Sequence, residues 1–158
     1  MKPNYWLLKS EPDVFSMQDL EKTKTQTTAW DRIRNYQARN FLRDQIKIGD
    51  LAFFYYSNAK PSGIAGIVKV ISDGYPDASQ FEKGTDYFDS ASTQASPRWY
   101  CVDVKYEKEF SQVIPLEALK KEKRLAKMVL LNSSRLSVQP VTADEWAHIL
   151  GMVERLSS

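Results

Sequence analysis

The 158-residue sequence contains one cysteine, Cys101, and one histidine, His148. A single cysteine excludes an internal disulfide framework, and together the two residues exclude a zinc site built from cysteine and histidine. Neither a Ser-His-Asp nor a Cys-His catalytic pairing can be argued, because Cys101 is expected within a strand and His148 within a helix near the C-terminus. We therefore expect no metal, no cofactor and no catalysis of these familiar kinds.

Glycine and long apolar runs are also scarce. The six glycines are scattered, and none has the spacing of a P-loop or of a dinucleotide-binding fingerprint. No apolar segment is long enough to cross a bilayer, and none resembles a signal segment. Together with the single cysteine, this predicts a protein of a reducing compartment, cytoplasmic or, in a eukaryote, nuclear, with no membrane partner.

An excess of charge of one sign is missing too, since 22 basic and 20 acidic residues leave a net charge of +2. This is too small for a general polyanion binder, so any nucleic-acid contact should be local and modest in affinity. Three carboxylates, Glu11, Asp13 and Asp31, could in principle supply the acid pair of a nuclease, which stays open as an alternative.

The length fits one domain covering residues 1–158, and the hydrophobic pattern predicts a mixed α and β structure. Strands are predicted over 5–9, 51–56, 64–71, 99–106 and 136–140. Helix starts are predicted at Ser16, Asn35, Pro115 and Thr142. Between Ser72 and Arg98 the apolar residues follow neither the helical nor the strand period. The aromatic residues of this segment favour an ordered loop across one mouth of the domain.

The segment from Trp30 to Asn40 has a composition that the requirements of folding alone do not explain. A helix capped by Asn35 would bury Ala38 and leave polar side chains on the opposite face. Arg39 and Arg43 lie four residues apart on that face, so we expect their guanidinium groups to be unpaired. Such guanidinium groups suit phosphate. The expected phosphate rim comprises Arg32, Arg34, Arg39, Asn40 and Arg43. The alternative is an ordinary amphipathic helix with a solvated basic face.

Aromatic residues beside this rim favour a base-binding site. Trp6 and Trp146 are expected in the core, whereas Trp30 and Trp99 could stack on a flipped or single-stranded base, worth about 1–3 kcal/mol per base. Amides and hydroxyls that could read the base edge are those of Ser10, Asn35, Ser57, Ser137 and Gln139. Each of these could equally pack or bond to the backbone.

Five strings together resemble the EVE domain, and the resemblance runs nearly end to end. They are Tyr5-Trp6-Leu7-Leu8-Lys9-Ser10-Glu11-Pro12; Trp30-Asp31 with Arg34-Asn35-Tyr36-Gln37-Ala38-Arg39-Asn40; Gly49-Asp50 with Phe53-Phe54-Tyr55; Gly63-Ile64-Ala65-Gly66; and Arg135-Leu136-Ser137-Val138-Gln139-Pro140-Val141. The resemblance implies an α+β fold, a PUA-like pseudo-barrel of about five or six strands with short surrounding helices. PUA, ASCH, YTH and SRA domains share this fold, and several bind RNA or modified bases in a pocket.

The implied function is non-enzymatic recognition of a modified nucleobase by a monomer. The leading candidate ligand is modified cytosine in DNA, such as 5-methylcytosine, and the second candidate is modified RNA. The implied pocket wall comprises Ser10, Trp30, Asn35, Tyr36, Tyr55, Ser57, Ser137 and Gln139, with Arg39 and Asn40 at the rim. Arg32 stands where the family often has glycine. Two alternatives remain: an enzyme acting on RNA or a nucleotide, as in some ASCH-like proteins, and a protein-interaction module that uses the 72–98 loop.

Overall fold

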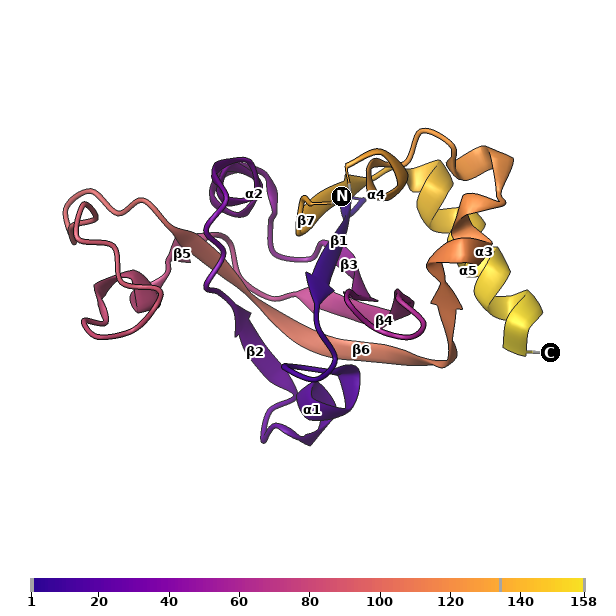
Figure 1. The fold of residues 1–158 in the computed structure, drawn as a ribbon, viewed down its shortest axis with the longest axis horizontal. Helices are drawn as coiled ribbons and strands as arrows, with labels where there is room; N and C mark the ends of the chain where they lie inside the picture. Colours follow the sequence, from indigo (N-terminus) through magenta and orange to yellow (C-terminus); the bar gives the residue numbers. More distant parts are fainter. Residues whose placement is uncertain (1, 134, 158) are drawn as a thin grey trace.

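A computed structural model describes residues 2–133 and 135–157. The described strands form one curved sheet in the order β2-β6-β4-β3-β1-β7, and the short β5 pairs with β6 (Figure 1). The strands are β1 (Tyr5–Ser10), β2 (Thr27–Trp30), β3 (Leu51–Tyr56), β4 (Gly63–Val70), β5 (Tyr75–Pro76), β6 (Tyr100–Pro115) and β7 (Val138–Val141). The predicted mixed α and β class is confirmed, with seven strands in the described residues rather than five or six.

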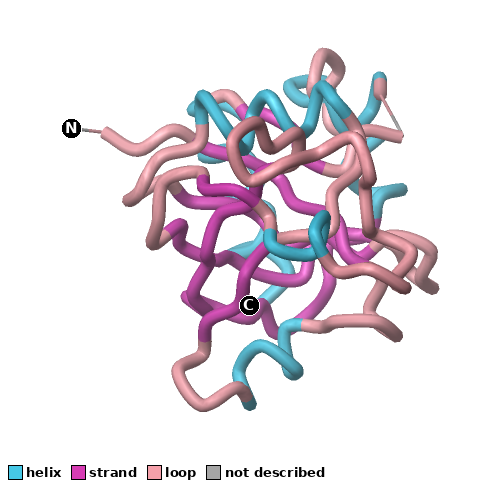
Figure 2. Tube along the Cα trace, turned by 90° about the vertical axis from the view of Figure 1, so that its left-hand side faces the viewer, coloured by secondary structure: helices cyan, strands magenta, loops and turns pink. Residues whose placement is uncertain are grey.

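Short helices surround the sheet (Figure 2). The α-helices are α1 (Met17–Lys22), α2 (Tyr36–Asn40), α3 (Leu116–Lys120), α4 (Val129–Asn132) and α5 (Ala143–Ser157). A π-helix, η1 (Phe41–Gln45), continues α2, and 3-10 turns form η2 (Ala78–Phe81) and η3 (Lys123–Leu125). The predicted helix starts at Ser16 and Thr142 are confirmed, and each forms a capping box, Ser16 with Asp19 on α1 and Thr142 with Glu145 on α5. None of the described helices is long and apolar enough to cross a membrane.

The sheet carries a core on each face because β3 is apolar at every position. Side chains alternate along a strand, so Phe54 and Tyr56 enter one core while Phe53 and Tyr55 enter the other. β3 pairs in parallel with β1 and antiparallel with β4. The prediction that this strand is buried on both faces is confirmed.

Two strand assignments from sequence were incomplete. β2 is not among the predicted strands, because Thr27 and Thr28 lie in a polar tract. It forms by pairing with β6, where Trp30 lies opposite Val102. β6 continues past the predicted end at residue 106 to Pro115, alongside β4. The expected irregularity at Gly66 is present, since the β4–β6 register shifts there and a Cβ would lie 2.4 Å from the Lys108 carbonyl oxygen.

Gln80 is one of the buried side chains that tie the 72–98 loop to the fold. Its Nε2 donates to the carbonyl oxygens of Asp77 and Trp99, and its Oε1 accepts from the backbone N–H of Trp99. The loop therefore has a defined course, as its aromatic content indicated. It extends from the sheet at the end opposite α5 (Figure 1).

Candidate functional site

A cavity of about 330 Å³ opens where β1 and β2 end. β1 contributes its last residues, the turn into α1 contributes apolar side chains, and the segment after β2 closes the third side. The lining residues are Lys9, Ser10, Val14, Phe15, Thr28, Ala29, Trp30, Asp31, Arg32, Ile33 and Tyr87. Apolar walls with a few polar groups are the usual make-up of a small-ligand site.

Trp30 forms part of the wall and also belongs to the core. Its side chain is 7% exposed, and its ring meets Phe54 edge-on at 5.3 Å between centroids. Phe15, which also lines the cavity, packs against Phe54 from another side at 6.4 Å. The two readings of Trp30, pocket wall and core residue, therefore hold at once.

Asp31 places a carboxyl group at the cavity in an unfavourable setting for its charge. Burial raises the pKa of Asp31 above its ordinary value, and the negative charge of Asp77 raises it further. Arg32 and Arg34 oppose this shift in part. Burial lowers the pKa of Lys9, which also lines the cavity. Asp31 can therefore act as a hydrogen-bond donor when protonated and as an acceptor in either state.

Ser10 lines the cavity, but its hydroxyl already has a partner. Ser10 Oγ donates to the Phe15 carbonyl oxygen at 2.7 Å, which fixes the turn after β1. The Ser10 backbone carbonyl accepts from the Ser57 N–H at 3.0 Å, so Ser57 extends the pairing of β1 and β3. The side chain of Ser57 is not among those lining the cavity.

Arg32 lies at the cavity in a left-handed backbone conformation, with φ of 65°. Glycine adopts this conformation without strain, which explains why glycine suits this position. Here the conformation is held by the Arg32 N–H, which donates to Asp77 Oδ2 at 2.6 Å, and the guanidinium carbon lies 5.0 Å from the centroid of the Tyr87 ring. Tyr87 reaches the cavity from the 72–98 loop.

Arg34 was expected at the phosphate rim, and the structure places its guanidinium elsewhere. Its Nη1 lies 3.3 Å from Oδ2 of the fully buried Asp77, and its Nη2 donates to Ser79 Oγ and to the Tyr87 carbonyl oxygen. Burial alone would raise the pKa of Asp77, but hydrogen bonds from Ser79 and the Arg32 N–H, with the charge of Arg34, hold it below its ordinary value. Arg34 therefore anchors the loop.

The expectation of unpaired arginines on α2 was wrong. Arg39 Nη1 donates to the Arg98 carbonyl oxygen at 2.8 Å, and Arg39 Nε donates to Asn40 Oδ1. Arg43 forms two bonds of 2.8 Å to the adjacent Asp44. These groups are exposed and can exchange partners, but a helical pattern read without its neighbours could not show them.

Trp99 does not reach the cavity. It is buried under the 72–98 loop, where its Nε1 donates to Asp89 Oδ2 at 2.8 Å. Its ring stacks on Tyr36 at 4.9 Å, and Arg34 lies over it. Tyr36 is half exposed and does not line the cavity either.

The remaining predicted pocket residues lie apart from the cavity. Asn35 caps α2 through its Oδ1 and lines a separate surface hollow with Arg135. Tyr55 points into the opposite core, because it alternates with Phe54 on β3. Asn35 shares a string with the cavity residues Trp30 and Asp31, but its side chain points elsewhere.

β7 supplies no cavity residue. The Ser137 carbonyl oxygen accepts from the Lys9 N–H at 3.0 Å, which is a sheet contact. Gln139 is fully buried, and its Nε2 donates to the Leu136 carbonyl oxygen at 2.7 Å. Gln139 therefore stabilises the turn before β7. Among the residues described, no cluster of three or more His, Cys, Asp or Glu side chains could hold a metal ion.

The sequence reasoning missed most of the cavity. Asp31 was weighed only as a catalytic acid, although it stands directly after Trp30. The other residues missed are Lys9, Val14, Phe15, Thr28, Ala29, Ile33 and Tyr87. Of these, only Lys9 belongs to a motif quoted for the resemblance, the one that runs from Tyr5 to Pro12. That motif was the one feature of the sequence that could have pointed to a missed cavity residue.

Comparison with known proteins places the chain in a family. A sequence model described as the EVE domain matches residues 4–152. The chain belongs to the EVE domain family. This EVE domain is 42% identical over 169 residues to human thymocyte nuclear protein 1, covering 96% of the present chain and 75% of the human one.

Solved structures agree closely with this EVE domain. A hypothetical protein from Leishmania major superposes with a TM-score of 0.93 at 44% identity, covering 99% of this chain and 98% of that one. Human THYN1 protein, crystallised in complex with DNA containing 5-methylcytosine, superposes with a TM-score of 0.89 at 43% identity, covering 96% and 98%.

Proposed function

We propose that this EVE domain binds DNA that carries a modified cytosine and holds that base in the cavity between β1 and β2. The observation that carries the proposal is the composition of the cavity: an indole and a phenyl wall, a half-buried carboxyl group of raised pKa at Asp31, and space of about 330 Å³. The human relative crystallised with 5-methylcytosine DNA supports the choice of ligand.

The polar chemistry favours cytosine through its Watson–Crick edge. Cytosine presents the N4 amino group as a donor and N3 as an acceptor, and aspartate is the usual acceptor for N4–H. A protonated Asp31 would complete the pair by donating to N3, and its raised pKa makes that protonation state accessible. Trp30 and Phe15 supply the apolar surface for the ring and for a methyl group.

A methyl group alone gives limited discrimination. Burying it contributes about 0.8 kcal/mol, a factor of about four, so strong preference for the modified base requires a close-fitting wall. The proposed role is binding without chemical conversion. We expect no product from DNA, RNA or nucleosides incubated with the protein.

The test is a panel of oligonucleotides that differ in one base: cytosine, 5-methylcytosine and thymine in DNA, and the corresponding bases in RNA. We expect the wild type to prefer 5-methylcytosine DNA over thymine and, more weakly, over cytosine, and we expect Asp31→Ala to lose the preference over thymine. Equal affinity for every member, or an unchanged preference over thymine in Asp31→Ala, would contradict the proposal. A chemical product in any incubation would favour the enzymatic alternative.

A further inference from the structure

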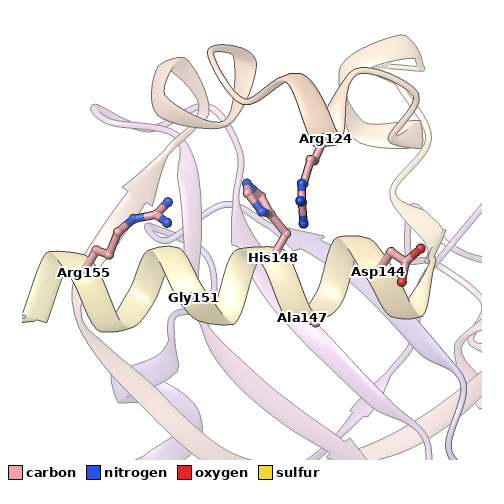
Figure 3. A pocket seen from close by; sticks show the side chains of 6 residues that line it. All are labelled: Arg124, Asp144, Ala147, His148, Gly151 and Arg155. Carbon is pink, nitrogen blue, oxygen red and sulfur yellow. The ribbon is translucent and has the colours of Figure 1, made fainter.

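A second and larger cavity, of about 620 Å³, lies against one face of α5. Asp144, His148, Gly151 and Arg155 recur every three or four residues and so share a helical stripe, with Ala147 beside it. Figure 3 shows His148 and Arg155 rising from the helix and Arg124 reaching toward them from η3. We call the space between these side chains the α5 groove.

The floor of the α5 groove is open. Gly151 has no Cβ, and a Cβ added there would meet nothing within 4 Å. Ala147 is the other small residue of the floor. A ligand can therefore approach the helix backbone between the two arginines.

One carboxylate, that of Glu122, lies within reach of two side chains of the groove. Its Oε1 lies 2.6 Å from His148 Nε2 and 3.5 Å from Arg155 Nη2. Asp144, at the start of α5, is the other acid at the groove. Arg124 is exposed and makes no hydrogen bond or ion pair with the residues that the structure describes.

A strongly basic segment lies beside this groove. Residues 120–127 contain five lysine or arginine residues and one glutamate, a net charge of +4, and the lysines are exposed. Residues 32–43, which follow β2, carry the same net charge of +4. A polyanion that approaches the protein is therefore attracted to the groove as well as to the segment after β2.

We propose that the α5 groove binds the sugar-phosphate backbone of the nucleic acid, with Arg124 and Arg155 contacting phosphate. This inference rests on the proposed function. Planar guanidinium groups match phosphate oxygens, and the open floor at Gly151 lets a backbone approach. Among the arginines near the base cavity, Arg34 is less available, since it pairs with the buried Asp77.

The 72–98 loop lies at one end of the molecule and α5 at the other, with β1 and β2 between them (Figure 1). No described residue lines both the base cavity and the α5 groove. One nucleotide cannot occupy both sites. The groove should therefore add affinity for a long ligand and none for a short one.

The test uses three substitutions at Gly151, where added atoms meet open space and each new residue favours a helix more than glycine does. Gly151→Glu puts a carboxylate into the groove, Gly151→Gln is the uncharged control of equal size, and Gly151→Lys adds a cation. For an unmodified duplex of about twenty base pairs at low salt, we expect Gly151→Glu to bind about tenfold more weakly than Gly151→Gln, and Gly151→Lys about threefold more tightly. The salt dependence should change by about one unit of slope in the corresponding direction.

An oligonucleotide of about four nucleotides carrying the modified base should bind all three variants alike. Equal duplex affinity of the glutamate and glutamine variants would overturn the proposal. So would a charge effect of equal size on the short ligand, because the groove would then be acting on the base cavity through long-range charge.

His148 gives an independent readout, because it is the only histidine and its ring resonances need no assignment. At constant pH, the unmodified duplex should shift the His148 ring signals in the wild type and in Asp31→Ala, but not in Gly151→Glu. If saturating duplex leaves the His148 ring signals of the wild type unshifted, the proposal that the α5 groove binds nucleic acid is overturned. If the base panel shows no preference while His148 still responds, the proposed function fails and the groove stands. A response to a polyglutamate peptide with none to the duplex would assign the groove to an acidic protein instead.

Discussion

At the scale of single residues, Asp31 is where stability and recognition oppose each other. Burial and the negative charge of Asp77 both disfavour its ionised form. A carboxyl group kept in such a setting costs stability at neutral pH. Its position beside Trp30 at the cavity suggests that recognition of the base offsets that cost.

Asp31→Asn separates the two effects. Asparagine can accept from cytosine N4–H and donate to N3 at any pH, so the variant should keep wild-type affinity within about threefold and lose its pH dependence. Wild-type affinity should fall as pH rises through the raised pKa of Asp31. Asp31→Ala should lose about 1–3 kcal/mol of binding, as a site with unpaired polar groups does. Binding titrations between pH 4 and pH 8 decide this.

The same variant should stabilise the free protein. A carboxyl group whose pKa is raised on folding contributes stability that is full below its unfolded pKa and lost as pH rises through the folded one. Asp31→Asn should therefore unfold at a higher denaturant concentration than wild type at pH 7, by less than about 1 kcal/mol since the group is partly exposed. The difference should disappear near pH 3; a variant that is less stable at pH 7 would contradict this account.

At position 32, a glycine variant should be more stable than an alanine variant, the reverse of the usual order. Because the φ of Arg32 is 65°, a side chain there is strained by about 1–2 kcal/mol, whereas glycine is not. Arg32→Gly should be more stable than Arg32→Ala by about 1 kcal/mol in urea unfolding. The common order, with alanine the more stable, would show that the backbone here is not left-handed.

Trp30 should be probed with phenylalanine rather than alanine. Truncating this buried indole to alanine should cost about 3–5 kcal/mol of stability, so lost binding would not isolate its role at the cavity. Trp30→Phe should stay folded and bind the modified oligonucleotide more weakly, because its π face is smaller. A thermal melt run beside the binding assay separates the effects; full affinity in a folded Trp30→Phe protein would argue against stacking.

At the scale of elements, the 72–98 loop depends on Asp77, which joins it to the segment after β2. Asp77 accepts from the Arg32 N–H and from Ser79, and it pairs with Arg34. Removing one partner of a buried pair leaves the other uncompensated. The loop should therefore be the part of the fold most sensitive to this one carboxylate.

Asp77→Asn should destabilise the protein by about 2–4 kcal/mol at pH 7. A carboxyl group with a lowered pKa contributes stability above its unfolded pKa, and that stability is lost as pH falls through the folded one. The gap between wild type and variant should therefore narrow below about pH 4, as urea unfolding at pH 7 and pH 3 would show. An equal difference in unfolding free energy at pH 7 and pH 3 would mean that the shape of the Asp77 side chain, and not its charge, stabilises the loop.

At the scale of the whole molecule, the cavity lies at strand ends and takes its walls from β1, β2 and the 72–98 loop. A base inside a duplex cannot reach such walls while stacked, and unstacking costs a few kcal/mol. Modified cytosine in a mismatch or a single-stranded overhang should therefore bind at least about tenfold more tightly than in a paired duplex. Equal affinities, measured by fluorescence anisotropy at one salt concentration, would show that the base is read without leaving the helix.

The local pattern of the sequence was sufficient for most elements. The apolar run of 51–56 predicted β3 to the residue, and the capping pairs at Ser16 and Thr142 predicted two helix starts. These features depend on neighbours within a few residues, which is why composition and period reveal them. The resemblance of five strings predicted the family, which the match over residues 4–152 confirms.

The site depended on tertiary structure, because a string of residues carries no direction. Trp30 and Asp31 line the cavity while Asn35 and Tyr36, five residues on, do not, since the chain turns at Arg32 and α2 faces elsewhere. Tyr87 reaches the cavity across 57 positions of sequence from Trp30 only because Arg34 and Asp77 hold its loop there. The sequence by itself determined the helix caps, the family and most strands, but neither β2 nor the second half of β6. Which side chains meet around the cavity was decided by pairing across the sheet and by the buried charge at Asp77, both of which join residues that lie far apart in the chain.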